Sequence, residues 1–197
     1  MALDVKNRFV WVDLEMTGLD PKAGIPLELG FVITDLDLNW LHAESWVLYE
    51  KDWEADGHYQ ARNTDPLVWT MHEKSGLWDD VGKIGQRLEA VTEEASYWLQ
   101  DHGVTPTDPM CGSSVQTDRL WIQEWFYDCF ARFSYRNVDV STVKELMRRF
   151  SPDIFADMEK CYPHAEAPHR VLGCLENTIA ELKFYRKEFL YVPADFQ

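Results

Sequence analysis

The chain has 197 residues, of which 34 are acidic and 19 are basic, so its formal net charge is −15. Hydrophobic side chains make up 46% of the residues and aromatic ones 14%, which is enough for a hydrophobic core and excludes an intrinsically disordered chain. A chain of this charge repels long nucleic acids, whereas a few placed cations can hold a short phosphorylated ligand. We expect one domain over residues 1–197, because the length suits a single domain and the sequence contains no repeat or linker.

The sequence favours a cytoplasmic protein. Its first eight residues lack the apolar segment of a signal peptide, and no run of residues approaches the ~18 apolar residues of a membrane span. We therefore expect reduced thiols rather than disulfides at the four cysteines, which are Cys111, Cys129, Cys161 and Cys174.

The hydrophobic pattern changes from strands to helices along the chain. Alternating β-rich segments predict an antiparallel meander of three strands over residues 9–15, 27–34 and 40–49. Helical spacing follows over residues 66–72 and 79–101. The remainder alternates between short strands and helices: a strand over 110–113, a helix carrying Asp118, Trp121 and Trp125, a strand over 138–140, a helix over 142–150 with Thr142 and Glu145 as a capping box, and a helix over 170–189. This order predicts an α/β fold with a mixed sheet.

Asp13 and Glu15 form the first candidate site. They are two positions apart on a predicted strand, so both side chains point to the same face. Two close carboxylates repel each other unless a cation lies between them, and Mg²⁺ or Mn²⁺ prefers such oxygen ligands. Considered alone, the pair is more often solvated surface charge.

Several longer motifs accompany this pair. They are VDLEMTGLDP at residues 12–21, PMCGSS at 109–114 followed by Asp118, YRNVDVST at 135–142, and PHRVL at 168–172. In this order they resemble the oligoribonuclease family of DEDD exonucleases, which use a catalytic histidine. The resemblance implies a ribonuclease H-like exonuclease fold, with a mixed central sheet and flanking helices.

The resemblance also implies roles for individual residues. It gives Asp13, Glu15 and Asp118 as ligands of two divalent cations, Mg²⁺ or Mn²⁺, and His169 as the general base. It implies substrate contacts at the following residues: Leu19, which wedges between two bases, and His72, Ser114, Tyr135, Arg136 and Ser141. Of these, Ser114, Arg136 and Ser141 match the family's pocket for a 5′-phosphate, and Tyr135 is expected to reach across from the second subunit of a homodimer. The implied reaction is two-metal hydrolysis of a phosphodiester.

The sequence departs from the family at the fourth acidic metal ligand. Gly173 and Cys174 stand where the family has two carboxylates, and a thiol is a poor ligand for Mg²⁺. Glu176 should point away from the site, because it lies about 200° further around the helix; compensation by Glu166 has no support in the sequence. We therefore expect weaker binding of at least one ion, with activity that is reduced or more dependent on Mn²⁺.

A zinc site is an alternative for the same region. Cys161, His164, His169 and Cys174 have the spacing C-x2-H-x4-H-x4-C, which resembles a zinc knuckle. Such a site would occupy His169 and end its role as a base. The simpler interpretation is that the cysteines are small, partly buried side chains and His164 is a loop residue.

Three functions therefore stay open at this point. The first is a metal-dependent 3′-to-5′ exoribonuclease that hydrolyses short 5′-phosphorylated oligoribonucleotides, chiefly diribonucleotides, to mononucleotides. The second is a catalytically impaired protein that binds and sequesters dinucleotides. The third, with the least support, is a zinc-stabilised interaction protein.

Overall fold

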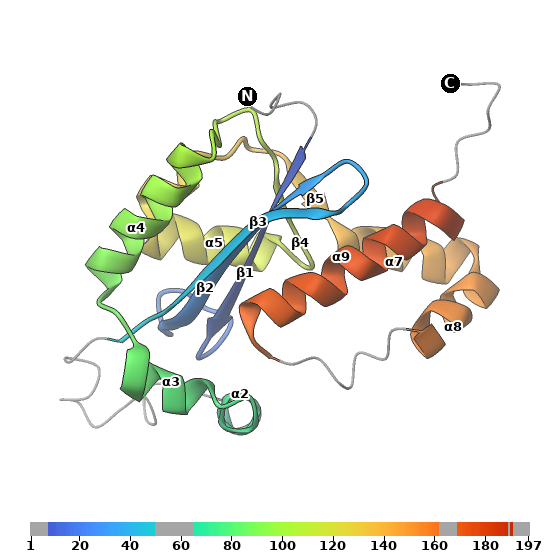
Figure 1. The fold of residues 1–197 in the computed structure, drawn as a ribbon. Coiled ribbons are helices and arrows are strands. Elements are labelled where there is room, and N and C mark those ends of the chain that lie inside the picture. Colours follow the sequence, from blue (N-terminus) through green and yellow to red (C-terminus); the bar gives the residue numbers. More distant parts are fainter. Residues whose placement is uncertain (1–7, 50–64, 162–168, 189, 191–197) are drawn as a thin grey trace.

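A five-stranded mixed sheet lies at the centre of the protein, with strand order β3-β2-β1-β4-β5 (Figure 1). The computed structural model describes residues 8–49, 65–161, 169–188 and 190. Its strands are β1 (Arg8–Met16), β2 (Pro26–Asp35), β3 (Trp40–Val47), β4 (Met110–Gly112) and β5 (Asn137–Asp139). β1, β2 and β3 pair antiparallel, and β4 and β5 join parallel to β1. The predicted meander and the mixed sheet are confirmed.

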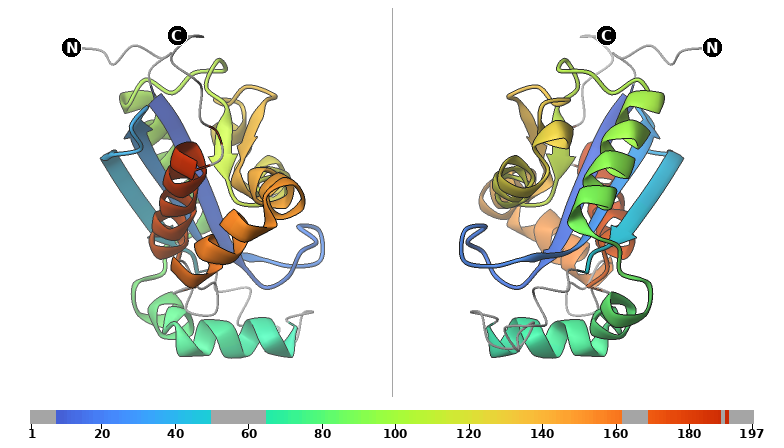
Figure 2. Two further views of the ribbon diagram at one scale, coloured as in Figure 1. Left: turned by 90° about the vertical axis from the view of Figure 1, so that its right-hand side faces the viewer. Right: turned by 90° about the vertical axis from the view of Figure 1, so that its left-hand side faces the viewer.

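Helices cover both faces of the sheet (Figure 2). One face carries α4 (Leu88–Asp101), α5 (Gln116–Trp125) and α6 (Tyr127–Phe130); the other carries α7 (Val140–Phe150), α8 (Pro152–Cys161) and α9 (Val171–Glu188). Two further helices, α2 (Pro66–Lys74) and α3 (Leu77–Ile84), lie at one end of the sheet (Figure 1).

The alternation of side chains along β1 divides the interior into two cores. Val10, Val12 and Leu14 belong to the core under α4 and α5, whereas Trp11 belongs to the core under α9. Because side chains alternate along a strand, Asp13 and Glu15 share the face of Trp11. The alternation therefore places both carboxylates beneath the start of α9.

Two predicted features are wrong. The helix expected over residues 79–101 is two helices, α3 and α4, because the backbone is extended at Gly85 (φ −57°, ψ 138°) and Gln86 forms a β-bridge with Leu48. The expected capping box is also absent. α7 begins at Val140, two residues earlier than predicted; the Thr142 hydroxyl donates to Asp139, and Glu145 pairs with Arg148 and Arg149 instead.

The other predicted elements are confirmed with small shifts at their ends, and the sequence reasoning missed α6 and α8. α2 begins as expected, since Pro66 is the first helical residue and the Asp65 carboxylate accepts a hydrogen bond from the Leu67 backbone N–H (2.8 Å). None of the helices in the described ranges is long and apolar enough to cross a membrane.

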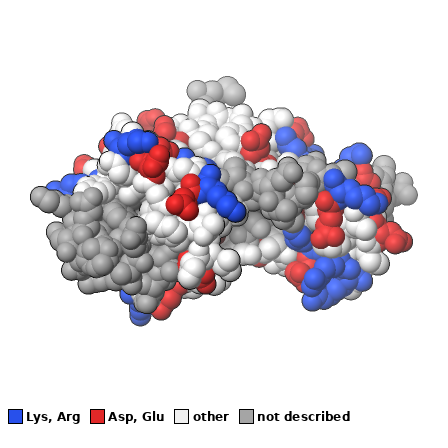
Figure 3. All heavy atoms as spheres, turned by 90° about the horizontal axis from the view of Figure 1, so that it is seen from below, with Lys and Arg blue, Asp and Glu red and all other residues white. Residues whose placement is uncertain are grey.

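Charged side chains of both signs are mixed on the surface. On the face seen from below, basic groups lie beside acidic ones (Figure 3). Some of these groups form exposed ion pairs, such as Lys83–Asp79 and Lys160–Asp157. This arrangement differs from the continuous basic surface that binds long nucleic acids.

Candidate functional site

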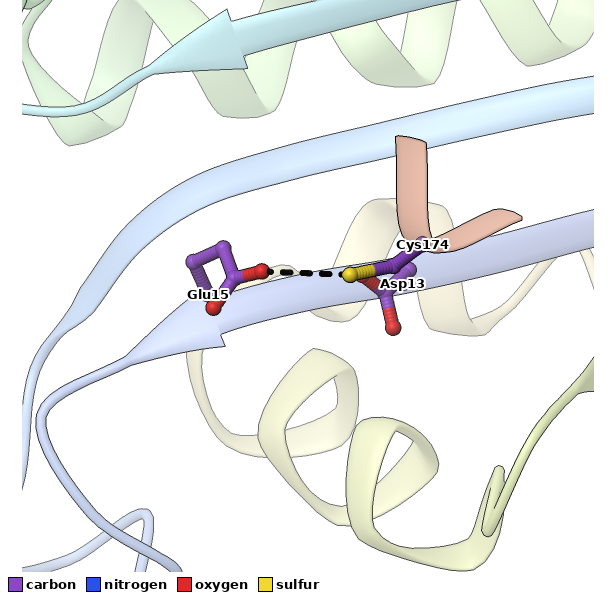
Figure 4. A group of neighbouring side chains, drawn as sticks. All are labelled: Asp13, Glu15 and Cys174. Carbon is purple, nitrogen blue, oxygen red and sulfur yellow. Dashed lines mark hydrogen bonds between the residues drawn. The ribbon is translucent and has the colours of Figure 1, made fainter. Parts of the chain in front are cut away.

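The carboxylate cluster, which we define as Asp13, Glu15 and Cys174, lies where α9 begins above β1. One oxygen of each carboxylate and the Cys174 sulfur all lie within 4.8 Å of one another. The thiol donates to Oε1 of Glu15 over 3.7 Å, and Figure 4 shows its sulfur directed at that carboxylate, with Asp13 alongside. The structure therefore brings together two of the three predicted acidic ligands with the residue that replaces the family's fourth.

Asp118 lies beside this cluster, in the first turn of α5. Its Oδ1 accepts a hydrogen bond from the backbone N–H of Leu14 (3.2 Å), the residue between Asp13 and Glu15. Asp118 is 5% exposed. This contact fixes the start of α5 against the strand that carries the other two carboxylates.

The carboxylates of this region disfavour their own ionisation. Burial, followed by repulsion from Asp118, Glu15 and Glu28, raises the pKa of Asp13 well above its ordinary value. Burial and repulsion from Glu28 raise the pKa of Glu15 to about 8, and burial raises that of Asp118 to about 7. Groups of one sign in a partly dry site have this property when no cation balances them.

A glycine allows α9 to approach the sheet this closely. Gly30 is the partner of Asp13 in the ladder between β1 and β2. A Cβ atom at Gly30 would lie 2.5 Å from Cγ2 of Val171, which is closer than two non-bonded carbon atoms can approach. The Gly30–Val171 contact therefore sets the height of α9 above β1, and with it the distance from Cys174 to Glu15.

A buried ion pair fixes the residues just before α9. Glu28, which sequence reasoning missed, is 2% exposed and is the register partner of Glu15. Nε and Nη2 of Arg170 donate to its two carboxylate oxygens (2.9 and 3.1 Å), and Nη1 donates to Asp80 of α3 (2.8 Å). A bidentate pair of this kind holds both partners in one geometry. It also anchors the residue that follows His169.

His169 has a strained backbone in the turn that this ion pair holds. Its φ angle is +47°, in the left-handed region that costs a non-glycine residue about 1–3 kcal/mol. His169 is half-buried and interacts electrostatically with His72. The turn thus places the predicted base on the side of the cluster where His72 lies.

His72 lies in the interior beside Glu15. Nε2 of its ring contacts the carbonyl oxygen of Met16 (3.1 Å), and Nδ1 is 3.7 Å from Oε2 of Glu15. Burial lowers the pKa of His72, so the neutral ring is favoured. A signal for this residue was present in the sequence, but the predicted contact was with substrate, and the structure adds a contact with the carboxylate cluster.

A second group of residues, which we call the Asp139 network, consists of Ser114, Asp139, Ser141 and Thr142. The backbone N–H of Ser114 donates to Asp139 (2.7 Å), as do the hydroxyls of Ser141 (2.9 Å) and Thr142 (2.8 Å). Ser114 has a φ angle of +55°, and its hydroxyl is 3.3 Å from that of Ser141. The structure thus joins the predicted pair Ser114 and Ser141 through one carboxylate.

Arg119 connects the first turn of α5 to the segment over residues 134–137, which precedes Asp139. It follows Asp118, is 8% exposed, and donates to Asn137 (2.7 Å) and to the carbonyl oxygens of Ser134 (2.7 Å) and Arg136 (3.1 Å). The segment that carries Tyr135 and Arg136 is therefore fixed from the same helix turn as Asp118. Arg119 stands in the motif that contains Asp118, but sequence reasoning gave it no role.

Three predicted substrate contacts lie on the surface. Leu19 and Tyr135 are each 81% exposed, and the Arg136 guanidinium lies over the Tyr135 ring, 4.8 Å from its centre. Large apolar side chains with this exposure gain little from the fold itself. They are available for contact with a ligand or a second chain.

Only two of the four predicted zinc ligands, His169 and Cys174, have side chains within the described residues. Cys174 is directed into the carboxylate cluster, while the side chain of Cys161 and all of His164 lie outside the described residues, as does Glu166. The four-ligand zinc arrangement therefore stays a prediction.

The donor set fits a divalent cation. One oxygen each of Asp13 and Glu15 lies within 4.8 Å of the other, Asp118 adds a third carboxylate nearby, and a cation would offset the repulsion that contributes to their raised pKa values. The sulfur of Cys174 adds a softer donor at the same place.

Two comparisons with known sequences agree with this geometry. The exonuclease family RNase_T matches residues 10–180. The oligoribonuclease of Aromatoleum aromaticum is 39% identical over 96% of this chain and 98% of its own. Those of Alcanivorax borkumensis and Halorhodospira halophila are 36% and 35% identical, over 95% and 94% of this chain and 98% and 96% of their own.

Solved structures confirm the fold. Exonuclease I of Escherichia coli in a complex with single-stranded DNA matches with a TM-score of 0.69 at 16% identity. Exonuclease I of Methylocaldum szegediense matches with a TM-score of 0.68 at 15% identity. Each covers 93% of this chain, which spans only 41% of theirs. The expected ribonuclease H-like exonuclease fold is confirmed, and the chain belongs to the oligoribonuclease family of 3′-to-5′ exoribonucleases.

Proposed function

We propose that this protein hydrolyses short 5′-phosphorylated oligoribonucleotides, diribonucleotides above all, to mononucleotides in a reaction that depends on divalent cations. The observation that supports this most strongly is the carboxylate cluster, whose repelling groups lie together at the start of α9 with Asp118 beside them. Family membership supports the same reaction class.

Asp13, Glu15 and Asp118 would hold the divalent cations, Mg²⁺ or Mn²⁺. Bound there, such ions supply positive charge to the phosphoryl transition state and lower the pKa of a water molecule. His169 would accept the proton of the attacking water, since its turn lies beside the cluster and is anchored through Arg170. A base in a fixed turn stays in reach of that proton without losing conformational freedom at each turnover.

The Asp139 network and Arg136 would bind the 5′-phosphate. The Ser114 hydroxyl, with the backbone held by Asp139, can donate to a phosphate oxygen, and Arg136 adds a cation. Asp139 accepts hydrogen bonds from the Ser114 backbone N–H and the Ser141 hydroxyl. Because a carboxylate repels a phosphate, its role would be to position these two residues rather than to contact the anion. Closure around one terminal phosphate would limit the substrate to very short chains.

Leu19 and Tyr135 would complete the substrate site. Their exposure suits a leucine that separates two bases and a tyrosine that acts across a homodimer. Light scattering tests the second role: a dimer is expected, and a monomer at micromolar concentration would contradict it.

The test is a chromatographic assay with a 5′-phosphorylated diribonucleotide and excess protein, in Mg²⁺, in Mn²⁺ and in EDTA. We expect mononucleotides with either metal, more slowly in Mg²⁺, and none in EDTA. Quantitative recovery of the dinucleotide in all three conditions, with saturable binding by calorimetry, would instead support the sequestering protein.

A further inference from the structure

Glu15 lies between a sulfur and an imidazole nitrogen. The thiol of Cys174 is 3.7 Å from its Oε1, and Nδ1 of His72 is 3.7 Å from its Oε2. The Gly30–Val171 contact holds this end of α9 close to the sheet, so the backbone that carries Cys174 lies next to β1. Neither neighbour is assigned above to metal binding or to proton transfer.

One of the two ring nitrogens of His72, Nδ1, has no hydrogen-bond partner in the described part of the chain. The Met16 carbonyl only accepts hydrogen bonds, so the contact at Nε2 requires the ring hydrogen on that nitrogen. The neutral ring then has a buried lone pair at Nδ1. A lone pair that faces a carboxylate oxygen requires a proton or a cation between them.

The chemistry of this donor set differs from that of a magnesium site. Mg²⁺ demands six oxygen ligands in near-ideal octahedral geometry, whereas Co²⁺ and Zn²⁺ accept sulfur and imidazole nitrogen together with carboxylate oxygen. Affinity of mixed sites also rises from Mn²⁺ through Co²⁺ toward the end of the first transition series. The sulfur at the fourth position thus changes which ion fits best.

We propose that Cys174 is a direct ligand of the metal centre and that, with Nδ1 of His72 beside Glu15, it makes this centre prefer an ion of the Co²⁺ or Zn²⁺ class over Mg²⁺. This inference rests on the proposed function, because it concerns the same centre. On coordination the S–H bond breaks, the sulfur keeps the electron pair, and the proton passes to the buffer without any change of oxidation state.

The test is an absorption titration of the metal-free full chain with Co²⁺, because thiolate coordination gives a sulfur-to-cobalt charge-transfer band in the near ultraviolet. We expect a saturable band in the wild type and its loss in Cys174→Ser and Cys174→Asp. Cys129→Ser, which changes a buried cysteine in the other core, is the matched control and should keep the band. Circular dichroism confirms that each variant is folded.

Competition between Mg²⁺ and bound Co²⁺ measures the proposed metal preference directly. In Cys174→Asp, which restores an oxygen ligand, the Mg²⁺ concentration that displaces half of the bound Co²⁺ should fall by about tenfold or more relative to the wild type. An unchanged displacement concentration would contradict the proposed preference.

Two outcomes of the titration would overturn the inference. Wild-type protein that binds Co²⁺ without the band would show that the sulfur is not a ligand. A band that survives in Cys174→Ser but is lost in Cys161→Ser would place the metal at a separate, zinc-type site. Hydrolysis of the diribonucleotide is measured independently, so the proposed function can hold when this inference fails.

Discussion

The carboxylate cluster and the Asp139 network are two polar regions that differ in how their negative charge is balanced. In the network, a single carboxylate accepts from a backbone N–H and two hydroxyls, so each group has a partner. In the cluster, the carboxylates face one another and a thiol, and their pKa values rise. The hydrogen-bonding groups of the first region find partners within the chain, whereas the carboxylates of the second are groups that a cation would pair with.

Two neighbouring glutamates repeat this contrast within one pair of strands. Glu15 and Glu28 are register partners and both are buried. Arg170 pairs with Glu28 through two hydrogen bonds, while Glu15 has the neutral His72 and the Cys174 thiol as neighbours. Glu28 thus receives its countercharge from the fold, whereas Glu15, beside two neutral groups, is a candidate ligand for an external cation.

Removing a carboxylate of the cluster should have the largest effect on activity. We expect Asp13→Asn to lower diribonucleotide hydrolysis by at least about 10²-fold, more than the loss typical of an outer-shell partner of a metal. The melting temperature should stay the same or rise, because one of several repelling groups is gone. Activity and thermal melting of the same preparation check this, and a fall in both would indicate a structural role.

Breaking the paired carboxylate should instead damage stability. Arg170→Ala leaves Glu28 buried without its cation, so we expect a loss of about 2–3 kcal/mol in the free energy of unfolding, reduced from the full cost because the arginine side chain is 29% exposed. Denaturant unfolding measures it. Lys83→Ala breaks the exposed pair with Asp79 and is the control, with an expected loss of less than about 1 kcal/mol.

Arg136→Ala tests the proposed phosphate pocket. Loss of a charged hydrogen bond should raise KM for a 5′-phosphorylated diribonucleotide by about 10- to 30-fold, with little change in kcat. The effect should vanish for a diribonucleotide without the 5′-phosphate. Arg132→Ala, whose guanidinium binds Ser96 and Gln100 on α4, should change neither constant. Equal losses for both substrates would place Arg136 outside the phosphate pocket.

The smallest expected effect is a pH dependence of metal-free stability. The folded-state pKa values of Glu15, about 8, and Asp118, about 7, exceed the ordinary values of 4.5 and 3.8. Stability from their protonated forms is present below about pH 4 and is lost as the pH rises through 7 to 8. We therefore expect the melting temperature of the metal-free protein to fall between pH 5.5 and 8.5.

A divalent cation should remove most of that fall, because it stabilises the ionised carboxylates that cause it. Glu15→Gln is the control for the many other groups that titrate in this acidic chain. A fall of the same size in Glu15→Gln as in the wild type would show that the cluster is not its source.

Much of the sheet and the central carboxylate pair could be predicted from the sequence. The period-two pattern along residues 9–15 fixes which side chains share a face, so it placed Asp13 and Glu15 together. The division between α3 and α4 could not be predicted in this way. It depends on a bridge from Gln86 to Leu48, a residue 38 positions earlier, and local helical spacing does not report such a contact.

The parts of the site that were missed are set by long-range pairing. Nothing in the sequence near Glu28 indicates that Arg170, 142 positions later, binds it. The role of Asp139 also depends on the fold, which shows that it accepts from Ser114, 25 positions earlier, as well as from Ser141. Cys174 was predicted to weaken a metal site, and the structure adds that its sulfur lies within 4.8 Å of carboxylate oxygens of Asp13 and Glu15.

The most direct test of the central claim is a calorimetric titration of metal-free protein with Mn²⁺, for the wild type and for Asp13→Asn. The account predicts saturable binding to the wild type, with a heat that depends on the ionisation enthalpy of the buffer because protons leave the cluster, and its loss or strong weakening in Asp13→Asn. Binding that is absent from the wild type, or that is equal in both proteins, would contradict it.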